Sequence, residues 1–229
     1  MPLLPIVAGQ IWHARHPVRF GPLRLTTRMT VVRLHNGDLW IHSPIPPSDD
    51  LVASLAALGP VRHVVAPNKS HHLFFLAFLQ RFPDAAGSIA PGLSAKRPDL
   101  AGFAETTVAG PWDADLQGHF IAGLPVLNET AWFHRASGTL ILADLLFSFS
   151  PANRGLMAVA ARALGVHDRL AMSRTMRWAV SDRPAFRASI RPLLDLQVHR
   201  VVVAHDQVVE DQAARRLRAA FAGFADPAV

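Results

Sequence analysis

Cysteine is absent from this sequence of 229 residues. Disulfides and thiolate metal sites are therefore excluded, and any metal ion must be held by His, Asp, Glu or water. Long apolar runs are also absent, since none approaches the roughly 18 residues that a membrane-spanning helix needs. The N-terminal segment has no cationic start before an apolar stretch, and Pro2 and Pro5 interrupt it. We therefore expect no signal peptide, no membrane association and a cytoplasmic protein.

Charge is scarce, with 17% charged residues and a net charge of +6 carried by arginine. The basic residues are scattered, and the densest group is Arg215, Arg216 and Arg218 on an expected terminal helix. No Lys/Arg run alternates with aromatic residues as in single-strand binders, so the pattern disfavours nucleic-acid binding. Half of the residues are hydrophobic, which is enough for the core of a single domain over residues 1–229.

The first half of the chain alternates strand and helix signals. The runs Arg28–Leu34 and Leu39–His42 flank an Asn-Gly turn and predict a hairpin. Ser48 is a suitable N-cap for a helix over Leu51–Leu58, which Gly-Pro ends. The expected elements that follow are a buried strand over Val61–Ala66, a turn over Pro67–Ser70 and a helix from about His71 to Phe82.

The second half gives a weaker signal in its middle and a clear one towards its end. A second hairpin is expected, and a helical pattern with interruptions follows it. The segments are a short strand at Ser88–Ala90, a loop with a short helix at Pro91–Asp99, an ambiguous stretch at Gly118–Gly123, hairpin strands at Thr130–His134 and Thr139–Ala143, helical patterns at Asn153–Met176 and Arg183–Leu194, a strand at Val198–Ala204 and a helix at Asp211–Phe221.

Three of the expected strands end in polar, titratable residues. Ala66 precedes the turn that leads to His71 and His72, Ala143 precedes Asp144, and Ala204 precedes His205. If these strands lie in neighbouring sheets with their ends aligned, the polar residues converge on one cleft.

This arrangement, together with several stretches of sequence, resembles a known family. The stretches are RMTVVRL at 28–34, LWIHSP at 39–44, APNKSHHLFF at 66–75, ETAWFHRASGTL at 129–140 and ADLLF at 143–147. They are similar to the DUF4336 family within the metallo-β-lactamase fold, over roughly residues 10 to 210. The resemblance implies an α/β fold of the four-layer αββα sandwich type with a metal site at one edge. Enzymes of this superfamily typically use two metal ions to activate a water molecule.

The resemblance also implies which positions would bind metal, and this sequence keeps only part of the pattern. When the His-x-His-x-Asp-His turn of the superfamily is matched on its final histidine, His72 is the last His and His71 takes the Asp position. Pro67 and Lys69 then replace two histidines. The Gly-His-Thr loop falls near 127–129 without a histidine, whereas Asp144 matches the bridging Asp and His205 the final His.

The candidate metal ligands are therefore His71, His72, Asp144 and His205, with Asp144 and His72 as candidate catalytic residues. Each has a structural alternative, because a histidine can cap a helix and an Asp can close a turn. Further candidates share a position beside these strands: Asn68 and Lys69 as an anion-binding pair, and Glu129 and His134 as substitute ligands.

Two functions follow from these residues. The first is a metal-dependent hydrolase with a single Zn²⁺ or Fe ion, acting on an ester, thioester or lactone of an unnamed small molecule. The second is a metal-free protein whose cleft binds a small anionic ligand or a protein partner. A homodimer that uses the apolar segment Leu156–Leu164 is a further expectation.

Overall fold

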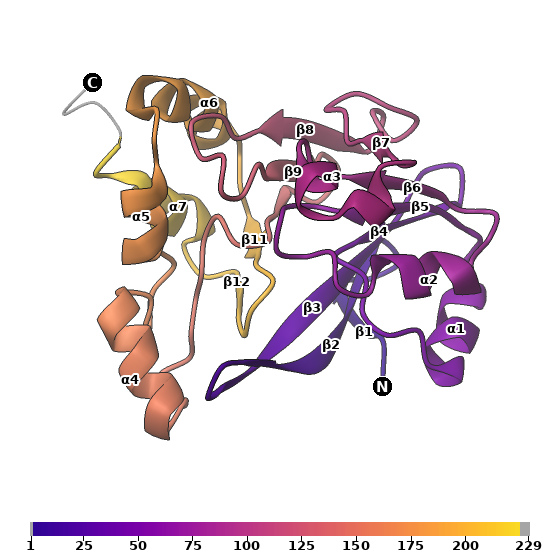
Figure 1. Ribbon diagram of the computed structural model, residues 1–229, viewed down its shortest axis with the longest axis horizontal. Helices are drawn as coiled ribbons and strands as arrows, with labels where there is room; N and C mark the ends of the chain where they lie inside the picture. Colours follow the sequence, from indigo (N-terminus) through magenta and orange to yellow (C-terminus); the bar gives the residue numbers. More distant parts are fainter. Residues whose placement is uncertain (1, 225–229) are drawn as a thin grey trace.

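The computed structural model describes residues 2–224, so both ends of the predicted domain 1–229 lie outside the described residues. Within the described part, two sheets pack face to face and helices cover both outer faces (Figure 1). This is the predicted four-layer αββα sandwich. Helices α1 and α2 cover one sheet, and α6 and α7 cover the other.

The first sheet has seven strands in the order in which they occur in the chain. Strands β1 to β4 pair antiparallel with their neighbours, and the pairs β4–β5, β5–β6 and β6–β7 are parallel. The strands are β1 (Leu4–Val7), β2 (Ile11–Phe20), β3 (Leu23–Arg33), β4 (Leu39–His42), β5 (Val61–Ala66), β6 (Ala86–Ile89) and β7 (Ala104–Glu105).

The second sheet has five strands in the order β12-β11-β10-β9-β8, and β10 pairs parallel with β11. Its strands are β8 (Leu116–Phe120), β9 (Thr130–His134), β10 (Thr139–Ile141), β11 (Arg200–Val202) and β12 (Val208–Val209). The helices within residues 2–224 are α1 (Asp49–Ala56), α2 (Phe75–Arg81), α3 (Leu93–Lys96), the short 3-10 helix η1 (Pro98–Leu100), α4 (Gly155–Leu164), α5 (Arg174–Ala179), α6 (Arg183–Asp195) and α7 (Ala213–Phe221).

Tryptophans fill the space between the two sheets. Trp40 of β4 and Trp132 of β9 meet edge to face with ring centroids 5.2 Å apart, and Trp112 packs on Trp132 at 5.6 Å. All three are buried. Edge-to-face aromatic pairs bury large areas in a fixed geometry. These rings therefore fix the position of one sheet relative to the other, and with it the positions of the residues that follow the strand ends.

Several local predictions are confirmed. The Asn-Gly turn joins β3 to β4 as an antiparallel hairpin, and β9 and β10 form the second hairpin. Ser48 is the N-cap of α1, and its hydroxyl accepts the backbone N–H of Leu51. Asp182 caps α6 in the same way by accepting the N–H of Ala185.

Three expectations differ from the structure. The predicted strand at Arg28–Leu34 corresponds to the second half of the longer strand β3, which pairs with β2 over nearly its whole length, from Ile11–Val32 to Phe20–Leu23. The prediction missed β2 since Pro17 interrupts it and most of its outer half is exposed. The expected helical stretch at 153–176 divides into α4 and α5 at Gly165, whose φ of 74° suits glycine and ends α4.

The third difference concerns the turn that carries the two histidines. Helix α2 begins at Phe75 instead of His71. The side chain of Asn68 accepts the backbone N–H groups of Ser70 and His71, both at 2.8 Å. This side-chain turn competes with helical hydrogen bonding and delays the helix. As a result, both histidines lie in an irregular turn.

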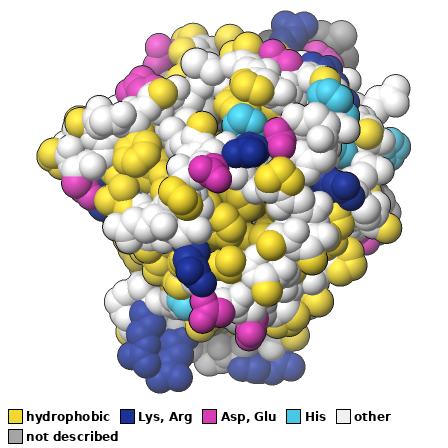
Figure 2. Space-filling model, turned by 90° about the vertical axis from the view of Figure 1, so that its right-hand side faces the viewer, with side chains coloured by type: hydrophobic (Ala, Val, Ile, Leu, Met, Phe, Trp, Pro, Cys, Tyr) yellow, Lys and Arg dark blue, Asp and Glu magenta, His cyan; other side chains and the backbone are white. Residues whose placement is uncertain are grey.

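The described residues contain no helix that is long and apolar enough to cross a bilayer. On the face shown in Figure 2, acidic, basic and hydrophobic side chains are interspersed. Helix α4 exposes Leu156 and Val159, with 54% and 62% of their surface accessible. A homodimer through this helix stays a prediction.

Candidate metal centre

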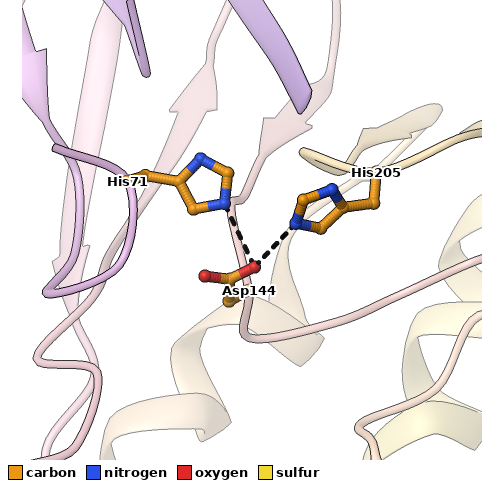
Figure 3. A group of neighbouring side chains, drawn as sticks. All are labelled: His71, Asp144 and His205. Atoms are coloured by element: carbon orange, nitrogen blue, oxygen red, sulfur yellow. Dashed lines mark hydrogen bonds and ion pairs between the residues drawn. The ribbon is translucent and has the colours of Figure 1, made fainter. Parts of the chain in front are cut away.

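Three side chains from distant parts of the chain meet at one edge of the sandwich: His71, Asp144 and His205 (Figure 3). Asp144 follows β10 and His205 follows β11. Because these neighbouring strands run parallel, they deliver both residues to the same edge of the five-stranded sheet. His71 comes from the turn after β5 in the other sheet. The predicted convergence of the three strand ends is confirmed.

One carboxylate oxygen of Asp144 lies close to both imidazole rings. Oδ1 of Asp144 lies 3.2 Å from Nε2 of His71 and 3.2 Å from Nε2 of His205. The three ligand atoms all lie within 4.8 Å of one another, and all three side chains are largely buried. A tetrahedral zinc with bonds of about 2.0–2.1 Å separates its ligand atoms by roughly 3.3 Å. The residues present therefore fit a metal ion.

The hydrogen bonding of His205 supports this fit. Its Nδ1 lies 2.8 Å from the backbone oxygen of Thr26, which can only accept, so Nδ1 carries a proton. In the neutral ring Nε2 then presents a lone pair towards the carboxylate of Asp144. Two acceptors at 3.2 Å require a proton or a cation between them. A histidine oriented by a backbone carbonyl is the usual arrangement around a bound metal.

His71 is oriented from the side opposite Asp144. Its Nδ1 lies 2.6 Å from Oγ of Ser43 and 3.4 Å from Oγ1 of Thr27. Ser43 has a φ of 56°, an uncommon backbone conformation for a residue with a side chain. The turn after β4 therefore holds a serine hydroxyl against this ring, which leaves Nε2 directed at Asp144.

Electrostatic interactions favour opposite charges on His71 and Asp144. Burial disfavours the charged imidazole, but the carboxylates of Asp144 and Glu129 outweigh it and raise the pKa of His71. Burial alone would raise the pKa of Asp144, yet His71 and His205 hold it well below its usual range. Asp144 is therefore an anion at neutral pH, which is the form that binds a metal.

Glu129 fixes the segment that carries Asp144. Its Oε1 accepts the backbone N–H of Ala143, and its Oε2 accepts those of Asp144 and Leu145, at 2.8 to 3.1 Å. Burial and the charge of Asp144 raise the pKa of Glu129 to about 7, whereas the N–H donors favour its carboxylate. With its oxygens occupied, Glu129 positions the site instead of serving as a substitute ligand.

Asn68 connects the turn to both carboxylates. Its Nδ2 donates to Oε2 of Glu129 at 2.8 Å and to Oδ2 of Asp144 at 3.1 Å, and it is fully buried. The bond to Oδ2 leaves Oδ1 of Asp144 facing the two imidazoles. Asn68 therefore has a positioning role in the structure, where the sequence suggested anion binding.

The structure does not bring the other candidates into this group. Nδ1 of His72 accepts a hydrogen bond from Arg97 at 2.9 Å, and burial and the charge of Arg97 lower the pKa of His72 to about 4. Nζ of Lys69 donates to the backbone oxygen of Pro125. His134 pairs with Thr139 at the opposite end of β10 from Asp144, and its Nδ1 lies 2.8 Å from Oγ of Ser137.

A cavity of about 570 Å³ opens onto the group, and all three side chains line it. Its remaining walls are mostly apolar and come from the tip of the β2–β3 hairpin, the segment after His71, the segment after Asp144, and α4 and α5. Clefts of this size that combine an apolar wall with a few polar groups are typical binding sites for small molecules.

Sequence reasoning missed the groups that orient the two histidines. Thr26 and Thr27 lie in the half of β3 that was not predicted. The position of the Ser43 hydroxyl depends on a positive φ, which the Ser-Pro sequence does not reveal. The position of Ser43 directly after a predicted strand was the one available signal. The apolar cavity walls were missed because they come from segments with no shared sequence pattern.

Comparison with known proteins gives a family and a fold. The family model described as "Domain of unknown function (DUF4336)" matches residues 8–189. No curated protein matches the chain. Similar solved structures include a metallo-β-lactamase from Pontibacter korlensis, with 13% identity, a TM-score of 0.64 and coverage of 96% of this chain and 98% of that one. A metallo-β-lactamase from Erythrobacter litoralis has 12% identity, a TM-score of 0.65 and coverage of 96% of both chains. Identities this low establish the fold alone.

Proposed function

The chain belongs to the DUF4336 family and has the metallo-β-lactamase fold, and on this premise we propose that it is a metal-dependent hydrolase of an ester, thioester or lactone. The single observation that carries the proposal is the position of Asp144 Oδ1, 3.2 Å from Nε2 of both His71 and His205 at the end of a cavity. The proposed ligands are these three residues, without His72. We keep the cytoplasm as the proposed location.

One Zn²⁺ or Fe ion is the proposed cofactor, and when bound it would supply Lewis acidity and a water molecule of lowered pKa. The protein's own residues would orient this chemistry. Thr26 and Ser43 fix the two imidazole rings, and Asn68 occupies the second oxygen of Asp144. Three protein ligands leave a coordination position free, as catalytic zinc sites do.

The overall reaction is hydrolysis. The oxygen of a water molecule forms a bond to the acyl carbon, and the bond from that carbon to the alkoxide or thiolate leaving group breaks. The leaving group becomes an alcohol or thiol by taking a proton from the water, and the acyl group becomes a carboxylic acid.

The test is a metal titration of untagged protein that has been stripped with a chelator. We expect one equivalent of Zn²⁺ or Fe²⁺ to bind and, at 100 times the dissociation constant, to stabilise the fold by about 2.7 kcal/mol. His71→Ala, Asp144→Asn and His205→Ala should each lose this stabilisation. The matched control is His72→Gln, which removes the neighbouring imidazole and should bind metal as the wild type does.

Activity is tested on the same set of proteins with esters, thioesters and lactones. Turnover that requires the metal and disappears in Asp144→Asn supports the proposal. Wild-type protein that neither binds metal nor gains stability would overturn it.

A second candidate function is supported by the raised pKa of His71. A protonated His71 donates to ionised Asp144 without any metal, and in a metal-free binding protein a second proton would have to lie between His205 and Asp144. In that case the three substitutions change ligand binding or stability, and added metal changes neither.

A further inference from the structure

We propose that the acyl part of the substrate is an unbranched aliphatic chain that lies in the apolar cavity. This inference rests on the proposed hydrolase function for the position of the acyl carbon. The cavity itself is an independent observation, because its walls surround a space of about 570 Å³ that begins at His71, Asp144 and His205.

The walls offer little to a polar substrate. Among the described residues that line the cavity, Arg19 is the only charged side chain apart from the three site residues, and it is exposed. The other polar side chains of the lining are hydroxyls, and most of them already have a partner within the protein: Thr27 and Ser43 contact His71, and Ser173 contacts Thr175, which leaves Ser70. A polar group that enters an apolar space without a hydrogen-bond partner costs about 1–3 kcal/mol. The chemistry of the lining therefore selects a substrate whose polar atoms are confined to the reacting end.

The apolar wall begins directly at the site. The ring of Phe147 stacks on that of His205 with centroids 5.8 Å apart and an angle of 6° between the planes. Phe149 stacks in turn on Phe147 at 6.2 Å. A chain attached to a carbonyl beside His205 would lie along these two rings.

The opposite wall ends in apolar side chains that water otherwise contacts. Phe20, at the tip of the β2–β3 hairpin, is 76% exposed, and Leu73, two residues after His71, is 67% exposed. Both line the cavity. Figure 1 shows this hairpin reaching from its sheet towards α4, and residues of both the hairpin and α4 line the cavity. Bound aliphatic carbon would remove both side chains from water.

The choice of a flexible chain follows from the rest of the lining. Met157 of α4 and Met176 of α5 have unbranched, flexible side chains that adjust to an occupant. A volume of about 570 Å³ lies within the range of about 300–1,000 Å³ that holds small-molecule ligands.

The test measures binding without turnover. Hexanoate, octanoate, decanoate and dodecanoate are titrated into the protein by calorimetry, with and without added Zn²⁺. Each buried CH₂ should tighten the dissociation constant about two- to fourfold. A dissociation constant that does not change with chain length, or tighter binding of naphthoate than of decanoate, would overturn the inference.

Substitutions identify the cavity as the place of binding. Phe20→Ser and Leu73→Ser alter exposed side chains, which keeps the fold intact, and should weaken dodecanoate more than hexanoate. Met157→Trp should fill the inner space and shorten the longest chain that binds. The matched control is Leu156→Trp, since Leu156 is exposed on the same helix and does not line the cavity. Equal effects of the two tryptophan variants would contradict the inference.

The same experiment separates this inference from the proposed function. Chain-length-dependent binding without metal-dependent turnover leaves the cavity assignment standing and overturns the hydrolase. Metal-dependent turnover of short esters that does not rise with longer acyl chains supports the hydrolase and overturns the cavity assignment.

Discussion

The backbone nitrogen of Asp144 lies 2.8 Å from Oε2 of Glu129, so one buried acidic residue positions another. The same Glu129 oxygen accepts hydrogen bonds from Leu145 N and from Asn68 Nδ2. The geometry of the site therefore depends on a residue whose side-chain hydrogen bonds go to Asn68 and to the backbone around Asp144.

Replacing this carboxylate should disturb both the fold and the metal site. In Glu129→Gln an amide NH₂ would face backbone N–H groups that lose their acceptor, at a cost of about 1–3 kcal/mol each. We expect a lower free energy of unfolding in urea and a metal affinity reduced about 10- to 100-fold. The control is Glu210→Gln, which alters an exposed carboxylate that pairs with Arg200. Unchanged metal affinity in Glu129→Gln would contradict the positioning role.

The hydroxyl beside His71 offers a finer test. Ser43→Gly removes the partner of Nδ1, and glycine accepts the φ of 56° without strain. We expect stability close to the wild type and a metal dissociation constant about tenfold weaker, measured by competition with a fluorescent chelator. Thr27→Val removes the more distant hydroxyl at 3.4 Å and should have a smaller effect. A larger effect of Thr27→Val would reverse the assignment.

A buried histidine next to the site should make the metal-free protein sensitive to acid. Burial and the charge of His71 lower the pKa of His42 to about 3. Because the unfolded state takes up the proton first, this contribution to stability is complete above the unfolded pKa of about 6.5. It is lost as the pH falls from there towards 3.

The measurement is urea denaturation at several pH values in the presence of a chelator. His42→Leu should flatten the fall in unfolding free energy between pH 6.5 and 4, while the exposed His199→Gln should not. Identical slopes in wild type and His42→Leu would show that another group controls the acid response.

The start of α6 has a close contact that admits only glycine. A Cβ added at Gly123, where φ is 73°, would lie 2.1 Å from the backbone oxygen of Asp182. Gly123→Ala should therefore destabilise the protein by about 1–3 kcal/mol. For a chain of this size, each kcal/mol lowers the melting temperature by roughly 2–4 °C. Gly102→Ala is the control, because its Cβ would meet nothing within 4 Å. Equal melting temperatures for the two variants would contradict the contact.

The sequence predicted the strands that carry the site better than the segments that enclose it. β4, β5, β9 and β10 are short β-branched or aromatic runs with turn residues at their ends, and these signals are local. β2 was missed because Pro17 and its exposed outer half conceal the alternation. Its tip nevertheless supplies one wall of the cavity.

The two adjacent histidines show where local information ends. The sequence placed both at the start of the helix expected after β5 and predicted both as ligands. Only the packed structure separates them, because Asn68 holds the turn open while Arg97, from a segment 25 residues further on, takes Nδ1 of His72. His71 is left facing Asp144.

What the sequence determined by itself was the residue types, their order and their place at the ends of strands. It limited any metal to nitrogen and oxygen ligands, since cysteine is absent. The tertiary structure decided which of these side chains meet. The parallel pairing of β10 with β11 sets Asp144 beside His205, and the packing of two sheets around tryptophans brings His71 to them. These contacts join residues more than 60 positions apart in the sequence. A local sequence pattern carries no information on whether two such distant residues come within 3.2 Å of each other.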